Sequence, residues 1–130
     1  MTDPVSRGSL LIVEDEAIIA WHLQDIVTSL GYAVCAMVGT EAAAVEAAHQ
    51  HLPDLILMDL RLAGGGDGLK AAEAIRRQRR DVPILFCTAH SGDPDLARRL
   101  LTVEGAAVLG KPINQAELKN AIETLIVSAN

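Results

Sequence analysis

The sequence predicts a doubly wound α/β domain in which five short strands alternate with five helices around a parallel sheet. Short apolar runs at residues 10–13, 33–38, 55–58, 84–87 and 106–109 alternate with longer segments of helical spacing. Each run is brief, aliphatic and bounded by turn residues or charges, which is typical of strands buried on both faces of a parallel sheet. A chain of 130 residues fits one compact domain. We expect a loose tail at residues 1–8 and the domain at residues 9–130.

Capping residues locate the helix ends. After the first strand, apolar residues recur every three or four positions, and Gly31 follows as a C-cap. Thr40 is placed to cap the alanine-rich helix after the second strand. Asp93 followed by Pro94 predicts the start of the fourth helix, and Asn114, in a capping-box pattern, predicts the start of the fifth.

Right-handed crossovers leave few topologies for five such units, and the flavodoxin-like strand order 2-1-3-4-5 is the natural one. Ligands of such sheets bind beyond the carboxyl ends of the strands. At those ends the sequence has Glu14 and Asp15 after the first strand, Asp59 after the third, Thr88 at the fourth and Lys111 after the fifth. Each of these residues alone would be read as a cap, a β-former or a loop residue. Their shared position in four of the five units favours a functional site.

The chemistry of this set points to phosphoryl transfer. Crowded carboxylates attract a hard divalent cation, and Asp15 with Asp59 suits a partly hydrated Mg²⁺ site. Glu14 would hold the ion through water or position the Lys111 ammonium. Asp59 can act as a carboxylate nucleophile towards phosphorus. Mg²⁺, Lys111, the Thr88 hydroxyl and the backbone amide of Ala89 would neutralise the phosphoryl oxygens.

Composition narrows the class of protein. The formal charge of −6 argues against a nucleic-acid binder, and no apolar stretch reaches the length of a membrane span. The cluster Arg76, Arg77, Arg79 and Arg80 is interpreted as a solvated helix end. The two cysteines are too few for the disulfide framework of a small secreted domain. The residues before the first strand lack the hydrophobic core of a signal peptide. We therefore expect a cytoplasmic protein.

The chain resembles the receiver domain of bacterial response regulators, with a fold like that of the chemotaxis regulators. The resemblance runs from Leu10 to about Ile126 and is carried by LIVED at 11–15, PDLILMD at 53–59, FCTA at 86–89, Gly105-Ala106, and KP at 111–112. Gly68 is similar to the glycine that opens the third helix of the family. The stretch around Thr88 partly resembles a motif of stand-alone receivers of the alphaproteobacterial type, whose fifth strand lacks an aromatic residue.

The resemblance implies a function. Asp59 would accept a phosphoryl group from a sensor histidine kinase or a histidine phosphotransfer protein, with Glu14 and Asp15 as the acidic pocket and the main-chain carbonyl of Arg61 completing the Mg²⁺ shell. Thr88 would move to the phosphoryl group, and Lys111 would pair with it. The Lys111–Pro112 peptide bond would be cis. The chain would then be a stand-alone, non-enzymatic regulator, a monomer or weak homodimer. It would signal to a downstream protein target by contact or by phosphorelay.

The loop at residues 61–68 and the residue at position 108 depart from the familiar pattern of the family. The glycine-rich loop at residues 61–68 is one residue longer than in chemotaxis-type receivers, so we expect it to be mobile and to gate the site. Val108 replaces the switching aromatic of the fifth strand, which leaves the rearrangement to the loop before the fourth helix and to that helix. His90, two residues after Thr88, would adjust water access if it is not simply exposed.

Three other functions were weighed. A receiver-like adaptor that acts without phosphorylation remains the alternative, although the complete acidic set argues against it. A phosphatase of the haloacid dehalogenase pattern needs an acid two residues after the nucleophile, where this chain has Arg61. A flavin binder is disfavoured because the acidic residues 14–16 would repel its phosphate.

Overall fold

Five parallel strands form a single sheet in the computed structural model, which describes residues 7–89, 94–100, 103 and 105–129. The strand order is β2-β1-β3-β6-β7, and counting these five strands along the chain turns it into the predicted 2-1-3-4-5. The strands are β1 (Ser9–Val13), β2 (Ala33–Val38), β3 (Leu55–Asp59), β6 (Ile84–Thr88) and β7 (Ala106–Gly110). The fold class is therefore confirmed.

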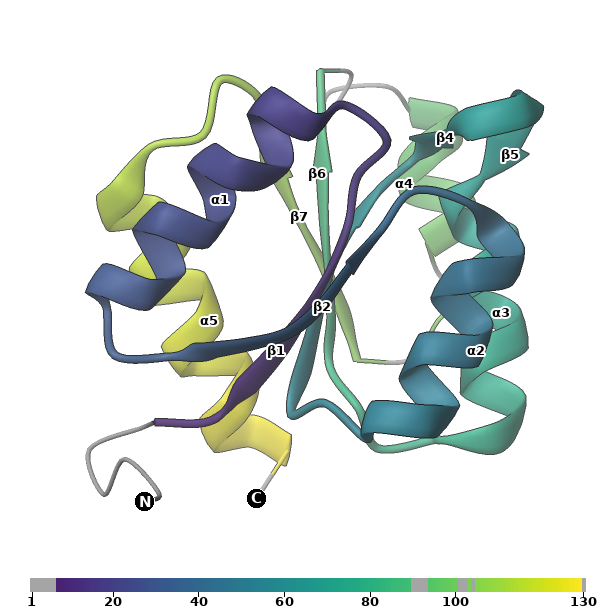
Figure 1. The fold of residues 1–130 in the computed structure, drawn as a ribbon. Coiled ribbons are helices and arrows are strands. Elements are labelled where there is room, and N and C mark those ends of the chain that lie inside the picture. The colour runs from purple at the N-terminus through teal and green to yellow at the C-terminus, as the bar shows by residue number, and fades with distance from the viewer. Residues whose placement is uncertain (1–6, 90–93, 101–102, 104, 130) are drawn as a thin grey trace.

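Helices cover both faces of the sheet (Figure 1). On one face lie α1 (Ala17–Ser29) and α5 (Gln115–Ala129), and on the other lie α2 (Glu41–His51), α3 (Gly68–Gln78) and α4 (Pro94–Leu100). Along β3, Leu55 and Leu57 pack with α1 and α5, whereas Ile56 and Met58 pack with α2 and α3. Two apolar clusters result, one on each side of the sheet, as the two-residue alternation of strand side chains requires.

Only the inner strands of the sheet have side chains buried on both faces, as the sequence predicted for all five. Residues 55–58 of β3 and all of β6 are buried, whereas β2 and β7 are mostly half-buried. The expectation that all five strands are buried on both faces was wrong for these two, because β2 and β7 form the edges of the sheet.

Capping follows the predicted pattern at three helix ends. The Thr40 hydroxyl accepts a hydrogen bond from the Ala43 N–H (3.1 Å), and the Asn114 side chain accepts one from the Glu117 N–H (3.0 Å). Gly31 follows α1 with a φ of 98°, the left-handed conformation expected of a C-terminal glycine. The predicted cap Asp93 lies outside the described residues.

The loop after β3 is more ordered than its glycine content suggests. It forms an antiparallel pair, β4 (Arg61–Leu62) and β5 (Gly66–Asp67), joined by the short helix η1 (Ala63–Gly65). We call β4, η1 and β5 together the β4–β5 hairpin. The Ala63 N–H donates to the Gly39 carbonyl (3.0 Å), which ties the hairpin to the loop before α2. The expected gating motion stays a prediction, but its starting point is a tethered hairpin.

Two of the four clustered arginines are structural. Arg76 donates to the Val82 carbonyl (2.6 Å) and Arg79 to the Pro53 carbonyl (2.9 Å), so both side chains join α3 to neighbouring loops. Arg77 and Arg80 are exposed. The interpretation as a wholly solvated helix end was therefore wrong for Arg76 and Arg79, whose partners lie in loops that the sequence pattern does not place.

Arg7 and Gly8, the last two residues of the expected tail, contact the domain. Arg7 donates its backbone N–H to Gly31 and a side-chain N–H to Glu123 of α5 (3.2 Å), and the Gly8 carbonyl accepts from Ala33. Residues 1–6, the rest of the expected tail, lie outside the described residues. Among the helices that are described, none combines the length and the apolar character needed to cross a membrane.

Candidate functional site

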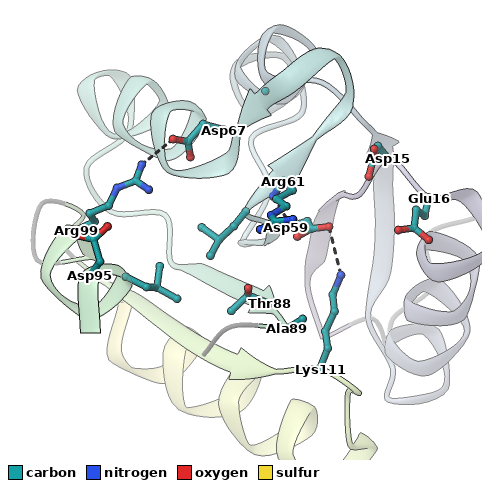
Figure 2. Close-up of a pocket in the computed structure, with 13 residues that line it drawn as sticks. Asp15, Glu16, Asp59, Arg61, Asp67, Thr88, Ala89, Asp95, Arg99 and Lys111 are labelled. Carbon is teal, nitrogen blue, oxygen red and sulfur yellow. Dashed lines mark hydrogen bonds and ion pairs between the residues drawn. The ribbon is translucent and has the colours of Figure 1, made fainter. Parts of the chain in front are cut away.

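A pocket of about 780 Å³ opens at the carboxyl edge of the sheet. Figure 2 shows Asp59 near its middle, with Asp15 and Glu16 on one side and α4 on the other. The lining residues are Asp15, Glu16, Asp59, Leu60, Arg61, Gly66, Asp67, Thr88, Ala89, Asp95, Leu96, Arg99 and Lys111. The strand ends thus bring most of the sequence-predicted residues into one cavity.

Three carboxylates gather beside this pocket. Oxygens of Glu14, Asp15 and Asp59 lie within 4.8 Å of one another, although β1 and β3 are separated by more than forty positions in the sequence. The parallel pairing of Val13 with Met58 explains the approach, because both chains continue past the sheet at the same level. Glu14 is buried, Asp59 half-buried and Asp15 exposed. Clustered hard oxygen donors, one of them open to water, fit the ligand preference of Mg²⁺.

Lys111 provides the opposite charge. Its Nζ lies 3.3 Å from Asp59 Oδ2 and 3.5 Å from Glu14 Oε2. Burial opposes the charged form, but the carboxylates of Asp59 and Glu14 outweigh it and raise the pKa of Lys111. The Lys111 backbone N–H donates to the Thr88 carbonyl (2.8 Å), and the following peptide bond to Pro112 is cis, as expected.

Glu14 is a buried carboxyl group with a raised pKa. Its side chain is 2% exposed, and burial raises its pKa to about 7. The hydrogen bond and the charge of Asp59 act in the same direction, and the Lys111 ammonium acts against them. Glu14 does not line the pocket itself, so its carboxyl group lies behind the pocket wall.

The remaining predicted residues surround Asp59. Thr88 is buried at the end of β6, and Ala89 is exposed; both line the pocket. The Arg61 N–H lies 3.3 Å from Asp59 Oδ1, and the exposed Arg61 side chain also lines the pocket. The part of its main-chain carbonyl in metal binding stays a prediction.

Val108 and His90 were expected to shape the switching surface. Val108 lies half-buried in β7 against the apolar cluster that includes Leu96 of α4. His90 lies outside the described residues.

A second group of polar residues was missed by sequence reasoning. The Asp67 carboxylate caps α3 through the Leu69 N–H (2.8 Å) and accepts from Arg99 of α4 (2.7 Å), while the Asp67 N–H donates to the Glu41 carboxylate (2.8 Å). Asp67 before Gly68 is a cap pattern that could have been found. The pairing with Arg99 carries no local signal, since 32 positions separate the two residues.

Only glycine fits at position 68, because the backbone of Asp59 occupies the space that a side chain would need. A Cβ at this position would lie 2.0 Å from the carbonyl oxygen of Asp59, so a side chain would collide with the backbone of the candidate nucleophile. The close packing of the α3 start against the end of β3 depends on this glycine.

Comparison with known proteins gives a consistent picture. The family model for the response regulator receiver domain matches residues 10–123. The transcriptional regulatory protein PdtaR of Mycobacterium tuberculosis is 37% identical over 117 residues, which are 90% of this chain and 56% of PdtaR. The phyllosphere-induced regulator PhyR of Methylorubrum extorquens is 35% identical over 117 residues, which are 87% of this chain and 41% of PhyR.

A solved structure of similar fold also matches this chain. The receiver domain of the sensor histidine kinase PA1611 from Pseudomonas aeruginosa PAO1 matches with a TM-score of 0.81 and 33% identity, covering 92% of this chain and 98% of that one. That crystal structure has a magnesium ion coordinated in the active site cleft. The present chain spans only about half the length of the curated relatives PdtaR and PhyR.

Proposed function

Because this chain belongs to the response regulator receiver family, we propose that Asp59 accepts a phosphoryl group in a Mg²⁺-dependent reaction. The donor is a sensor histidine kinase or a histidine phosphotransfer protein. The observation that carries the proposal is the placement of Asp59, with Lys111 Nζ 3.3 Å from its Oδ2 and two further carboxylates in reach of a shared cation.

The proposed reaction is a displacement at phosphorus. An oxygen of Asp59 forms a bond to phosphorus, the bond from phosphorus to the donor imidazole nitrogen breaks, and that nitrogen keeps the electron pair and takes up a proton. Asp15 and Asp59 would hold Mg²⁺ directly, with Glu14 acting through water and the Arg61 carbonyl completing the shell. When bound, the ion neutralises charge on the phosphoryl oxygens.

The chain's own residues supply the remaining stabilisation. Lys111 pairs with a phosphoryl oxygen, and the Thr88 hydroxyl and the Ala89 backbone amide donate hydrogen bonds to the others. The phosphorylated side chain carries about −1.5 to −2 charges, where the Asp59 carboxylate carried one, in a site that is already acidic, so both cations are needed. The signal then leaves through protein contact on the surface formed by α4, β7 and α5, or through onward transfer of the phosphoryl group to another protein. A protein with these partners would work in the cytoplasm.

A receiver-like adaptor that acts without phosphorylation is the second candidate. Val108 favours it, because an aliphatic side chain at this place in β7 cannot carry the ring rotation that reports phosphorylation in the familiar switch. The two candidates differ in one result: an adaptor of this kind binds its partner equally well when Asp59 is replaced by Asn.

The decisive experiment is intact-mass spectrometry after incubation with acetyl phosphate, with and without Mg²⁺. Wild-type protein should gain one phosphoryl group only with Mg²⁺, and Asp59→Asn should gain none. Asp81→Asn is the matched control, because Asp81 is exposed in the loop before β6, at the amino ends of the strands and away from the site. Phosphorylation of Asp59→Asn to the wild-type extent, or failure of wild type with both acetyl phosphate and a phosphorylated donor, would count against the proposal.

A further inference from the structure

Asp67 connects three elements that surround the phosphoacceptor. Its Oδ1 caps α3 at Leu69, its Oδ2 accepts from Arg99 of α4 at 2.7 Å, and its backbone N–H is held by Glu41 of α2. Figure 2 shows the Asp67–Arg99 pair crossing from the hairpin side of the pocket to α4. Both residues line the same pocket as Asp59.

Asp67 is also linked to Asp59 through one intermediate residue, Arg61. In the β4–β5 hairpin it lies directly opposite Arg61, and the Arg61 N–H donates to Asp59 Oδ1 at 3.3 Å. A single rung of the hairpin thus separates Asp67 from Arg61, the residue whose N–H is bonded to Asp59. From Asp67 the next contact is α4, the helix on the expected output surface.

We propose that the Asp67–Arg99 ion pair transmits the state of Asp59 to α4, with Asp67 as the positioning residue for the β4–β5 hairpin. The inference rests on the proposed function and deepens it. A phosphoryl group on Asp59 and its counter-charges displace Arg61; the hairpin carries Asp67 with it, and Arg99 moves α4. This route needs no aromatic side chain in β7, where the chain has Val108.

The chain offers closely matched variants for a test. Arg99→Gln removes the charge from the pair, whereas Arg98→Gln removes a charge from the neighbouring position, where the guanidinium pairs within α4 with Asp95 at 3.8 Å. Asp67→Asn keeps a good helix cap for α3 but loses the ionic partner of Arg99. The double variant Asp67→Asn/Arg99→Gln completes a double-mutant cycle, which measures the coupling between the two residues.

Hydrogen–deuterium exchange of the metal-free protein is the first measurement. Partly exposed ion pairs contribute little, so we expect Arg99→Gln to speed exchange in hairpin residues 61–67 by about two- to five-fold, although the substitution lies in α4. Asp67→Asn should speed exchange in α4 by a similar factor, and the double variant should add little to either single change. Arg98→Gln should leave the hairpin at the wild-type rate. Additive effects in the cycle, or equal effects of the two arginine variants on the hairpin, would overturn the coupling.

The second measurement compares proteins phosphorylated with acetyl phosphate, with the adduct quantified by mass. In wild type, exchange in α4 should change with phosphorylation; in Arg99→Gln, compared at an equal amount of adduct, the α4 response should fall at least two-fold. An equal response in both proteins refutes the transmission but leaves phosphorylation of Asp59 standing. Absence of the adduct from wild type with every donor refutes the proposed function, and the transmission with it.

Discussion

Replacing Glu14 by Gln should make the metal-free protein more stable, although it removes a residue of the acidic pocket. The Glu14 side chain is 2% exposed, and burial, together with the hydrogen bond and charge of Asp59, raises its pKa from 4.5 to about 7. Above pH 7 the folded protein must keep this carboxylate ionised, at a cost of about 3 kcal/mol at most. Gln has the same shape without the charge, but it loses the attraction to Lys111. A net gain of about 1–2 kcal/mol in the free energy of unfolding is expected at pH 8.

The pH dependence has a defined sign. Because the folded state binds the Glu14 proton more tightly than the unfolded state, the stability contributed by this group is complete below pH 4.5 and falls as the pH rises from 4.5 to about 7. The difference between Glu14→Gln and wild type should grow through that window and level off above it.

Urea unfolding in the presence of a chelator, at several pH values between 5 and 8, measures the effect. Glu46→Gln, an exposed change on α2, is the control and should show no such growth. Titration with Mg²⁺ should reverse the order, since wild type has the carboxylate that favours the ion and gains more from binding. The reasoning fails if metal-free Glu14→Gln is less stable than wild type at pH 8, or if the difference does not vary with pH.

Three further predictions concern packing and recognition. Gly68→Ala should cost about 3 kcal/mol or more in urea unfolding, because its Cβ would lie 2.0 Å from the Asp59 carbonyl oxygen; a loss below 1 kcal/mol would show that α3 shifts freely. Trp21→Ala should slow phosphorylation by a donor protein roughly tenfold but leave acetyl phosphate unaffected, since Trp21 is 57% exposed on the helix that begins beside the pocket. Leu52→Ala, which removes an exposed side chain at the far edge of the sheet, is its control, and equal slowing in both variants would argue against a docking role. Burial raises the pKa of Cys87 to about 12, so an aromatic disulfide reagent at pH 8 should leave this thiol unmodified until urea unfolds the protein; rapid modification of the native thiol would contradict its burial.

The strands were predictable because hydrophobic pattern alone determines them. The boundaries of β2 were predicted at both ends, and the other sheet strands extend only one residue further than their apolar runs. The β4–β5 hairpin was not predictable, since strands of two residues in a glycine-rich loop leave no alternation to read. Its order comes from contacts with Gly39 and Glu41, which are distant in the sequence.

The candidate site likewise has residues that the sequence predicted and residues that it did not. Asp59, Thr88 and Lys111 were found because the topology sends the end of every parallel strand to one edge, so position along the chain predicts position in space. Arg99 was not predicted, because its ion pair with Asp67 depends on how α4 lies against the β4–β5 hairpin. The roles of Arg76 and Arg79 were misjudged for a similar reason: their acceptors are carbonyls in loops, which a charge pattern does not reveal.

The alternation of β3 between two apolar clusters limits where this chain tolerates a change of length. Leu55 and Leu57 face α1 and α5, while Ile56 and Met58 face α2 and α3. One residue inserted within β3 would therefore move the residues that follow it to the opposite face of the sheet and turn Asp59 to the wrong side. An insertion after Asp59 enters the β4–β5 hairpin instead, where a turn absorbs it and every upstream side chain keeps its face. The extra residue expected in the loop at residues 61–68 would fall in this tolerant stretch. An engineered insertion, such as a reporter tag, fits best between Gly64 and Gly65, where a Cβ would meet no atom beyond the chain neighbours within 4 Å; both glycines should be kept, because each has a positive φ that strains other residues.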